Sequence, residues 1–124
     1  HNLSYYLAHK AMHNVPSFRK YHDFHHKFDK HIIPSIGNAV STMEFTVAYV
    51  SPFIVGSLFL NINEITFLVP VTLIIVFNCF IHSKELAKTK WNKYFVSPKM
   101  HIKHHKVRNR HYSAPIINID RILE

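Results

Sequence analysis

The chain has 124 residues, of which 48% are hydrophobic and 14% aromatic; this composition allows one folded domain over residues 1–124 and excludes a disordered tail. The formal net charge of +8 indicates an acidic partner or an anionic surface, and nucleic acid is the usual first candidate. Because the chain begins at His1 and not at Met, we expect it to be a segment of a longer protein with N-terminal sequence missing.

The basic residues are divided between the two ends of the chain. All 15 Lys and Arg lie in residues 10–30 or 84–121, whereas residues 32–81 carry only Glu44 and Glu64 as charges. A chain that is basic, then apolar, then basic is typical of a protein with a membrane segment. We therefore expect a membrane and no nucleic acid among its partners.

Two helices are predicted near the N-terminus. Good helix formers predict the first over residues 3–12, and the Val15-Pro16-Ser17 stretch ends it. The second is expected over residues 18–30 with Ser17 as its N-cap. Pro34 and Gly37 then mark a bend.

The middle of the chain predicts a hydrophobic helical hairpin over residues 45–81. Two apolar runs, 45–60 and 65–81, are separated by the polar residues 61–64. At about 1.5 Å per residue each run spans about 25 Å, slightly less than a bilayer core of about 30 Å, and a membrane helix tolerates Pro52 and Pro70. A helical core in a soluble protein is the alternative. The lack of Lys and Arg in the turn favours the membrane and places both flanks in the cytoplasm.

The third part of the chain is predicted to contain one more helix. Ser97 and Pro98 begin it, residues 113–115 are turn-like, and residues 116–124 give no clear pattern.

Histidine clusters on both flanks indicate metal binding. A helix places residues three and four apart on one face, so a His-x-x-x-His pair or a His-x-x-His-His triplet offers two or three imidazoles to one point. The chain has one pair and two triplets, enough for two metals. A solvated histidine-rich surface or a polar core explains this density less well. The motifs are His9 and His13, then His22, His25 and His26, and finally His101, His104 and His105.

The predicted hairpin allows both flanks to share one site, because two crossings return the chain to its starting side. His82 follows the second apolar run directly and would emerge at the membrane surface, within reach of the other histidines.

These motifs resemble the fatty acid hydroxylase and sterol desaturase superfamily, and the match covers most of the chain. The resemblance lies in HKAMH (9–13), HDFHH (22–26), FIHS (80–83) and MHIKHH (100–105). Supporting details are the Val15-Pro16 step, the Ser-Pro-Lys-Met lead at 97–100, and the Ile-Asp-Arg-Ile-Leu segment at 119–123.

The resemblance implies an all-α integral membrane protein with its metal site facing the cytosol, in the endoplasmic reticulum or in a bacterial inner membrane. It implies a di-iron oxygenase that hydroxylates or desaturates a sterol or fatty acyl C–H bond with O₂. Electrons would come from an acidic donor, a cytochrome b5-type domain or a ferredoxin, and zinc would substitute for iron in preparations. The implied metal ligands are His9, His13, His22, His25, His26, His82, His101, His104 and His105.

The chain departs from the family pattern at Leu86, where some relatives have a second histidine, and we expect Asn78 to compensate through a water or a hydrogen bond. A degenerate, non-catalytic metal-binding membrane protein is therefore a second hypothesis, and a basic nucleic-acid or membrane-surface binder is a third. Among the acids, Asp23, Glu44 and Asp120 are candidates to orient imidazoles. Three further histidines, expected to be mostly solvated, are His1, His31 and His111.

Overall fold

The computed structural model describes residues 1–123, whose regular secondary structure is helical; the one β-contact in this range is an isolated bridge between Phe95 and Ile117. The prediction of an all-α fold is thus confirmed for the described residues. The α-helices are α1 (Asn2–Asn14), α2 (Pro16–His26), α3 (Thr42–Glu44), α4 (Ser51–Ser57), α5 (Glu64–Ile81), α6 (Pro98–Val107) and α7 (Ile119–Leu123). Between them lie the 3₁₀ helices η1 (Asp29–His31), η2 (Pro34–Asn38) and η4 (Glu85–Lys88), and the π-helix η3 (Phe45–Val50).

Helix α2 begins two residues earlier than predicted. Its N-cap is Val15, in the extended conformation, and Pro16 occupies the first turn. Proline suits this position because its fixed φ is already helical and its missing N–H has no helical acceptor there. The prediction of Ser17 as N-cap was therefore wrong. The helix also ends at His26 and not at residue 30, and a short 3₁₀ turn, η1, follows.

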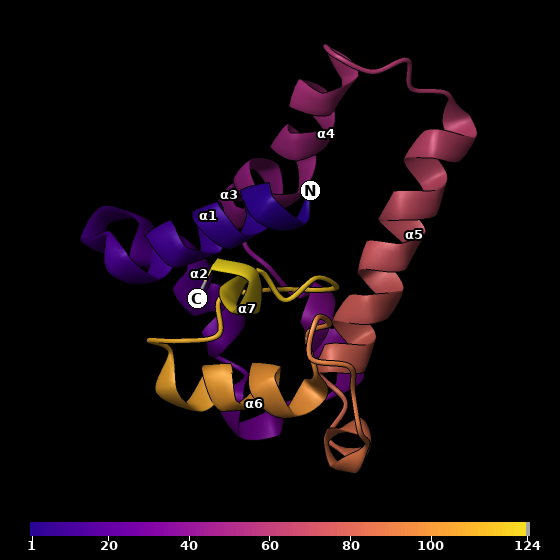
Figure 1. Ribbon diagram of the computed structural model, residues 1–124. Helices are drawn as coiled ribbons and strands as arrows, with labels where there is room; N and C mark the ends of the chain where they lie inside the picture. The colour runs from indigo at the N-terminus through magenta and orange to yellow at the C-terminus, as the bar shows by residue number, and fades with distance from the viewer. Residues whose placement is uncertain (124) are drawn as a thin grey trace.

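The predicted hairpin is present as two unequal arms, which Figure 1 shows rising from the rest of the molecule to a connecting loop. The first arm is a succession of α3, η3 and α4, in which the π-helical stretch precedes Pro52. Proline has no N–H to donate into a regular helix, so the backbone ahead of it departs from α-helical winding. The second arm is the single helix α5, which begins with a capping box between Asn63 and Thr66.

The hairpin exposes its apolar side chains. Only 17% of α5 is buried, and Phe59 in the connecting loop is 80% exposed. A core helix of a soluble protein would be mostly buried, so this exposure favours the membrane interpretation. Among residues 1–123, α5 is the one helix long and apolar enough to cross a membrane. That the hairpin crosses twice stays a prediction.

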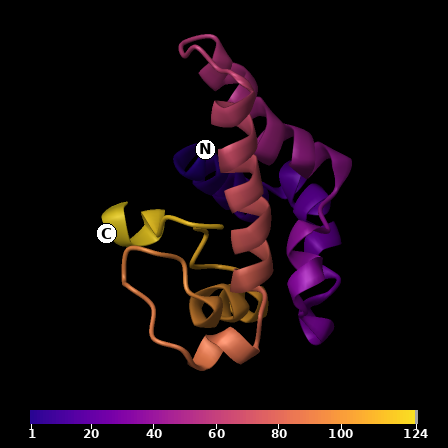
Figure 2. The same cartoon turned by 90° about the vertical axis from the view of Figure 1, so that its right-hand side faces the viewer.

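The rest of the chain forms a base beneath the hairpin, built from α1, α2, α6 and the last turns of α5; Figure 2 shows the upper part of α5 standing clear of it. The buried apolar residues of the base come from both ends of the chain and include Tyr5, Met12, Ile81 and Val96. The C-terminal segment, which had no clear sequence pattern, folds back on α1, where the backbone N–H groups of Ile116 and Ile117 donate to the side chain of Asn2.

Candidate metal centre

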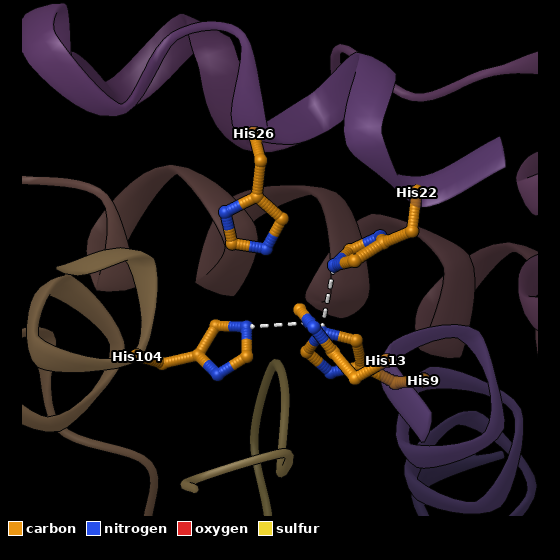
Figure 3. Close-up of side chains that lie close together, drawn as sticks. All are labelled: His9, His13, His22, His26 and His104. Carbon is orange, nitrogen blue, oxygen red and sulfur yellow. Dashed lines mark hydrogen bonds between the residues drawn. The ribbon is translucent and has the colours of Figure 1, made fainter. Parts of the chain in front are cut away.

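The structure brings all nine histidines of the motifs together in the base, where they form two groups. Within each group, one ring nitrogen of every histidine lies within 4.8 Å of the corresponding nitrogens of the others. Figure 3 shows the five rings of the larger group gathered from α1, α2 and α6. Both flanks of the hairpin contribute histidines to both groups. This is expected if the two flanks lie on the same side of a membrane. The five-histidine group is His9, His13, His22, His26 and His104, and the four-histidine group is His25, His82, His101 and His105.

Each triplet is divided between the two groups. Helix α2 gives His22 and His26 to the first group and His25 to the second. Neighbouring residues on a helix point about 100° apart, so adjacent histidines cannot aim at one point. Two histidines of each triplet therefore meet at one point, within the expected two or three, and the third histidine serves the other group.

Seven of the nine rings are held in place through Nδ1. Four of them donate this N–H to backbone carbonyl oxygens, which only accept, so Nδ1 carries the proton and Nε2 keeps a free lone pair. Such contacts fix both ring orientation and tautomer in histidine metal ligands. The four are His9 to Tyr112 O at 2.7 Å, His25 to Ala39 O at 3.1 Å, His82 to Asn78 O at 2.7 Å and His104 to Arg110 O at 2.8 Å.

Carboxylates orient three more rings. Nδ1 of His22 lies 2.8 Å from Glu44 Oε1, and Nδ1 of His26 and of His105 lie 3.0 and 2.6 Å from Asp29 Oδ1. The suggestion that Glu44 orients an imidazole is confirmed, but the suggestion for Asp23 is wrong, because Asp23 is exposed and pairs with Arg108 at 3.8 Å.

The sequence reasoning gave Asp29 no such role, although its position three residues after His26 was a usable signal. Asp120 contacts no imidazole in the described residues. It accepts hydrogen bonds from the backbone N–H groups of Tyr112 and Ser113. Asp120 therefore supports the loop in which the carbonyl oxygen of Tyr112 accepts from Nδ1 of His9.

The distances between Nε2 atoms fit ligands around a cation. In the five-histidine group, His9 and His22 are 2.8 Å apart and His13 and His104 are 3.1 Å apart. In the four-histidine group, His82 lies 3.3, 3.1 and 3.0 Å from three partners. Two lone pairs facing each other do not form a hydrogen bond. Nitrogens about 2.1 Å from one ion, at tetrahedral or octahedral angles, lie about 3.0–3.4 Å apart. The spacings of 3.0 to 3.3 Å match this range and the 2.8 Å spacing is slightly shorter, so the residues fit an ion in each group.

Burial favours the neutral imidazole that a metal needs. It lowers the pKa of all nine rings, and repulsion from neighbouring imidazoles adds to this for most of them. The pKa falls to about 3 for His13 and to about 4 for His104. Nε2 of His26 is buried without a hydrogen-bond partner among the described residues, which leaves its lone pair available to an ion.

Glu44 is the most deeply buried acid at the site. Burial raises the pKa of its carboxyl to about 9, and Oε2 has no hydrogen-bond partner among residues 1–123. An ion on Nε2 of His22 would keep the Nδ1 proton on that ring and would favour the ionised carboxylate opposite it.

The four-histidine group has no further imidazole in the described residues, and Leu86 is half-buried in η4. The expected hydrogen bond from Asn78 to this group is present, but it comes from the backbone: the Asn78 carbonyl oxygen accepts from Nδ1 of His82, while the Asn78 side chain donates to Tyr49 Oη at 3.3 Å.

Three histidines lie outside both groups. His31 is exposed as expected, and His111 joins neither group. His1 differs from the expectation of solvation, because its ring packs against Tyr5, Tyr49 and Phe53 and both of its ring nitrogens are buried.

The structure has two openings with different linings. An apolar cavity of about 670 Å³ lies between the hairpin arms, with Phe53 and Phe67 in its wall, and Asn38 and Tyr49 as polar side chains in its lining. A polar cleft of about 290 Å³ is lined by residues that include His13, Arg19 and Arg108. His13 is half-buried, whereas the other eight histidines are buried.

The fold and site define a helical protein in which buried histidines form two candidate metal groups at the foot of an exposed apolar hairpin. The family model for fatty acid hydroxylase matches residues 1–124, so the chain belongs to the fatty acid hydroxylase family. The resemblance drawn from the histidine motifs is thereby confirmed. No curated protein and no solved structure matched the chain.

Proposed function

We propose that the protein is a membrane di-iron oxygenase that hydroxylates or desaturates a C–H bond of a fatty acyl or sterol lipid. The observation that carries this proposal is the pair of all-nitrogen groups in a chain of the fatty acid hydroxylase family, which also has an apolar cavity between its hairpin arms. Family membership indicates an oxidoreductase; iron, O₂ and the lipid substrate are the proposal.

Nine neutral imidazoles would hold the two ions. Imidazole suits iron, copper and zinc alike, so ligand type does not select the metal, and zinc would occupy the site in preparations with little iron. When bound, an iron pair supplies the reductive activation of O₂ that attack on an unactivated C–H bond requires. Neutral ligands add no negative charge, so the nearby carboxyls of Asp29 and Glu44 provide the compensating charge that the protein itself contributes.

The cavity between the arms suits a lipid chain. Its wall is formed mainly by apolar side chains, among them Phe53, Phe67 and Ile74. Tyr49 lines the cavity and also contacts Tyr5, whose ring is 5.3 Å from that of His9. A lipid that slides in from the bilayer would therefore bring a carbon towards the histidines while its chain stays among apolar groups.

We place the base on the cytosolic side of the endoplasmic reticulum membrane or of a bacterial inner membrane. The positive-inside rule supports this orientation, because the basic residues belong to the base. The polar cleft with Arg19 and Arg108 would then face the cytosol, where an acidic electron donor, a cytochrome b5-type domain or a ferredoxin, would approach.

A non-catalytic metal-binding membrane protein is the second candidate function. The observation that favours it is the four-histidine group, which lacks a further imidazole where Leu86 stands. Both candidates predict bound metal, and only the first predicts an oxidised lipid.

The deciding experiment is expression of the protein, with any sequence that flanks this chain, in a host that lacks related enzymes, followed by metal analysis and lipid mass spectrometry. We expect about two irons per chain and an O₂-dependent hydroxylated or unsaturated lipid. His25→Ala and His104→Ala should abolish the product and lower the bound metal, whereas His31→Ala, at an exposed ring outside both groups, should change neither. Metal without product would support the second candidate, and product in His104→Ala would refute the first.

A further inference from the structure

One oxygen atom connects the two histidine groups. Oδ1 of Asp29 accepts from Nδ1 of His26, at 3.0 Å, and from Nδ1 of His105, at 2.6 Å. His26 belongs to the five-histidine group and His105 to the four-histidine group. The two rings reach this oxygen from different helices, 79 residues apart in the sequence, with their centroids 4.8 Å from each other.

The second carboxylate oxygen of Asp29 is held by Arg108. Its guanidinium donates to Oδ2 through Nη2 at 2.5 Å and through Nε at 3.2 Å. Arg108 is the C-cap of α6 and has a left-handed backbone, with φ of 55°. The end of α6 therefore turns Arg108 towards η1, which carries Asp29.

These contacts leave the carboxylate little freedom to move, because two imidazoles hold one oxygen and a fork-shaped guanidinium holds the other. His26, Asp29 and His105 are also close enough to hold an ion themselves. The Nδ1 atoms point at the carboxylate, however, and the guanidinium occupies its other oxygen, so Asp29 acts as an acceptor and not as a ligand.

We propose that Asp29 is a positioning residue that serves both metal groups at once and sets the affinity of each for its ion. This inference rests on the proposed metal binding. An acceptor at Nδ1 makes Nε2 a better donor to a metal and holds the ring at the correct angle. Since Asp29 does this for one ligand of each group, its loss affects two ions, whereas the loss of the Glu44 carboxyl, whose one imidazole partner among residues 1–123 is His22, affects one.

The test is titration of the metal-free protein with Co²⁺ in detergent, followed by visible absorption, whose bands report coordination geometry. We expect the wild type to bind two ions. In Asp29→Ala both binding steps should weaken by about 10- to 100-fold and both sets of bands should shift. Asp29→Asn keeps an oxygen in place but removes its charge, so its affinities should fall between those of wild type and Asp29→Ala. Glu44→Gln should weaken one step alone.

Asp23→Ala is the matched control, because Asp23 also pairs with Arg108 but contacts no imidazole among the described residues; both steps should stay as in wild type. Weakening of only one step, or of none, in Asp29→Ala would overturn the inference. If Asp29→Ala does not fold, two unchanged steps in Asp29→Asn would overturn it as well. A wild type that binds no Co²⁺, Zn²⁺ or Fe²⁺ would instead refute the proposed metal centre.

Discussion

A Cβ atom on Gly37 would lie 2.4 Å from the carbonyl oxygen of Asn78 and 2.8 Å from Nδ1 of His82. That carbonyl is the acceptor that fixes His82 in the four-histidine group. Glycine is needed here for close approach and not for an unusual backbone angle, since neither glycine of the chain has a positive φ. One missing side chain therefore lets η2 pack directly on the last turn of α5.

Gly37→Ala should destabilise the protein by about 1–3 kcal/mol, the usual cost of overpacking, and should displace His82. We expect reduced metal at the four-histidine group and an earlier midpoint in chemical denaturation, measured in detergent. Gly56→Ala is the control, because a Cβ there meets no atom within 4 Å. Since Gly56 lies inside α4, that variant should be neutral or more stable by up to about 1 kcal/mol. Equal stability for both variants would show that η2 and α5 do not meet closely.

At the scale of elements, local sequence patterns predicted which segments are helical better than how they are arranged. The Ser97-Pro98 start of α6 is confirmed, because Ser97 Oγ accepts from the N–H of Met100 in a local cap. Spacings of three and four residues also predicted that histidines on one helix approach each other. The assignment of each ring to one ion was not predictable, because it depends on how α1, α2 and α6 cross.

The choice of acid shows the same limit. Asp23 lies within α2, beside the histidines in sequence, yet it faces away from them. Asp29 lies beyond the end of the helix, and the 3₁₀ turn η1 brings it back under His26. Where α2 ends, and therefore which carboxylate reaches the rings, follows from tertiary packing that the sequence pattern does not contain.

Helix α5 provides the test of membrane insertion. Leu73, near its middle, is 44% exposed, so a lysine there meets no steric conflict. In a bilayer this substitution costs about 2.5–3.5 kcal/mol, and in water very little. Leu73→Lys should therefore lower the fraction of protein recovered in membranes after a high-salt wash. Ile122→Lys, at a 56% exposed position in α7, should leave that fraction unchanged. If Leu73→Lys behaved like Ile122→Lys, α5 would not lie in the membrane.

At the scale of the whole molecule, the metal-free protein must bury eight imidazoles, and half-bury that of His13, in one small base. Burial lowers the pKa of each of them below the ordinary 6.5, to about 2 for His105 and about 4 for His104, so all are neutral in the fold at pH 7. An unfolded chain exposes the same rings to water, where they take up protons as the pH falls through about 6.5. The unfolded state then binds more protons than the folded state.

The stability of the metal-free protein should therefore change little above about pH 7 and fall steadily as the pH drops below about 6.5. Each ring that is neutral in the fold and protonated when unfolded removes up to about 1.4 kcal/mol per pH unit, so several rings together make the slope steep. The measurement is the thermal denaturation midpoint of chelator-treated protein in detergent between pH 7.5 and 5. His104→Asn, with one buried imidazole fewer, should reduce the slope, and His31→Ala, at an exposed ring, should not. A midpoint that stays constant over this range would contradict the burial of neutral imidazoles on which the metal centre depends.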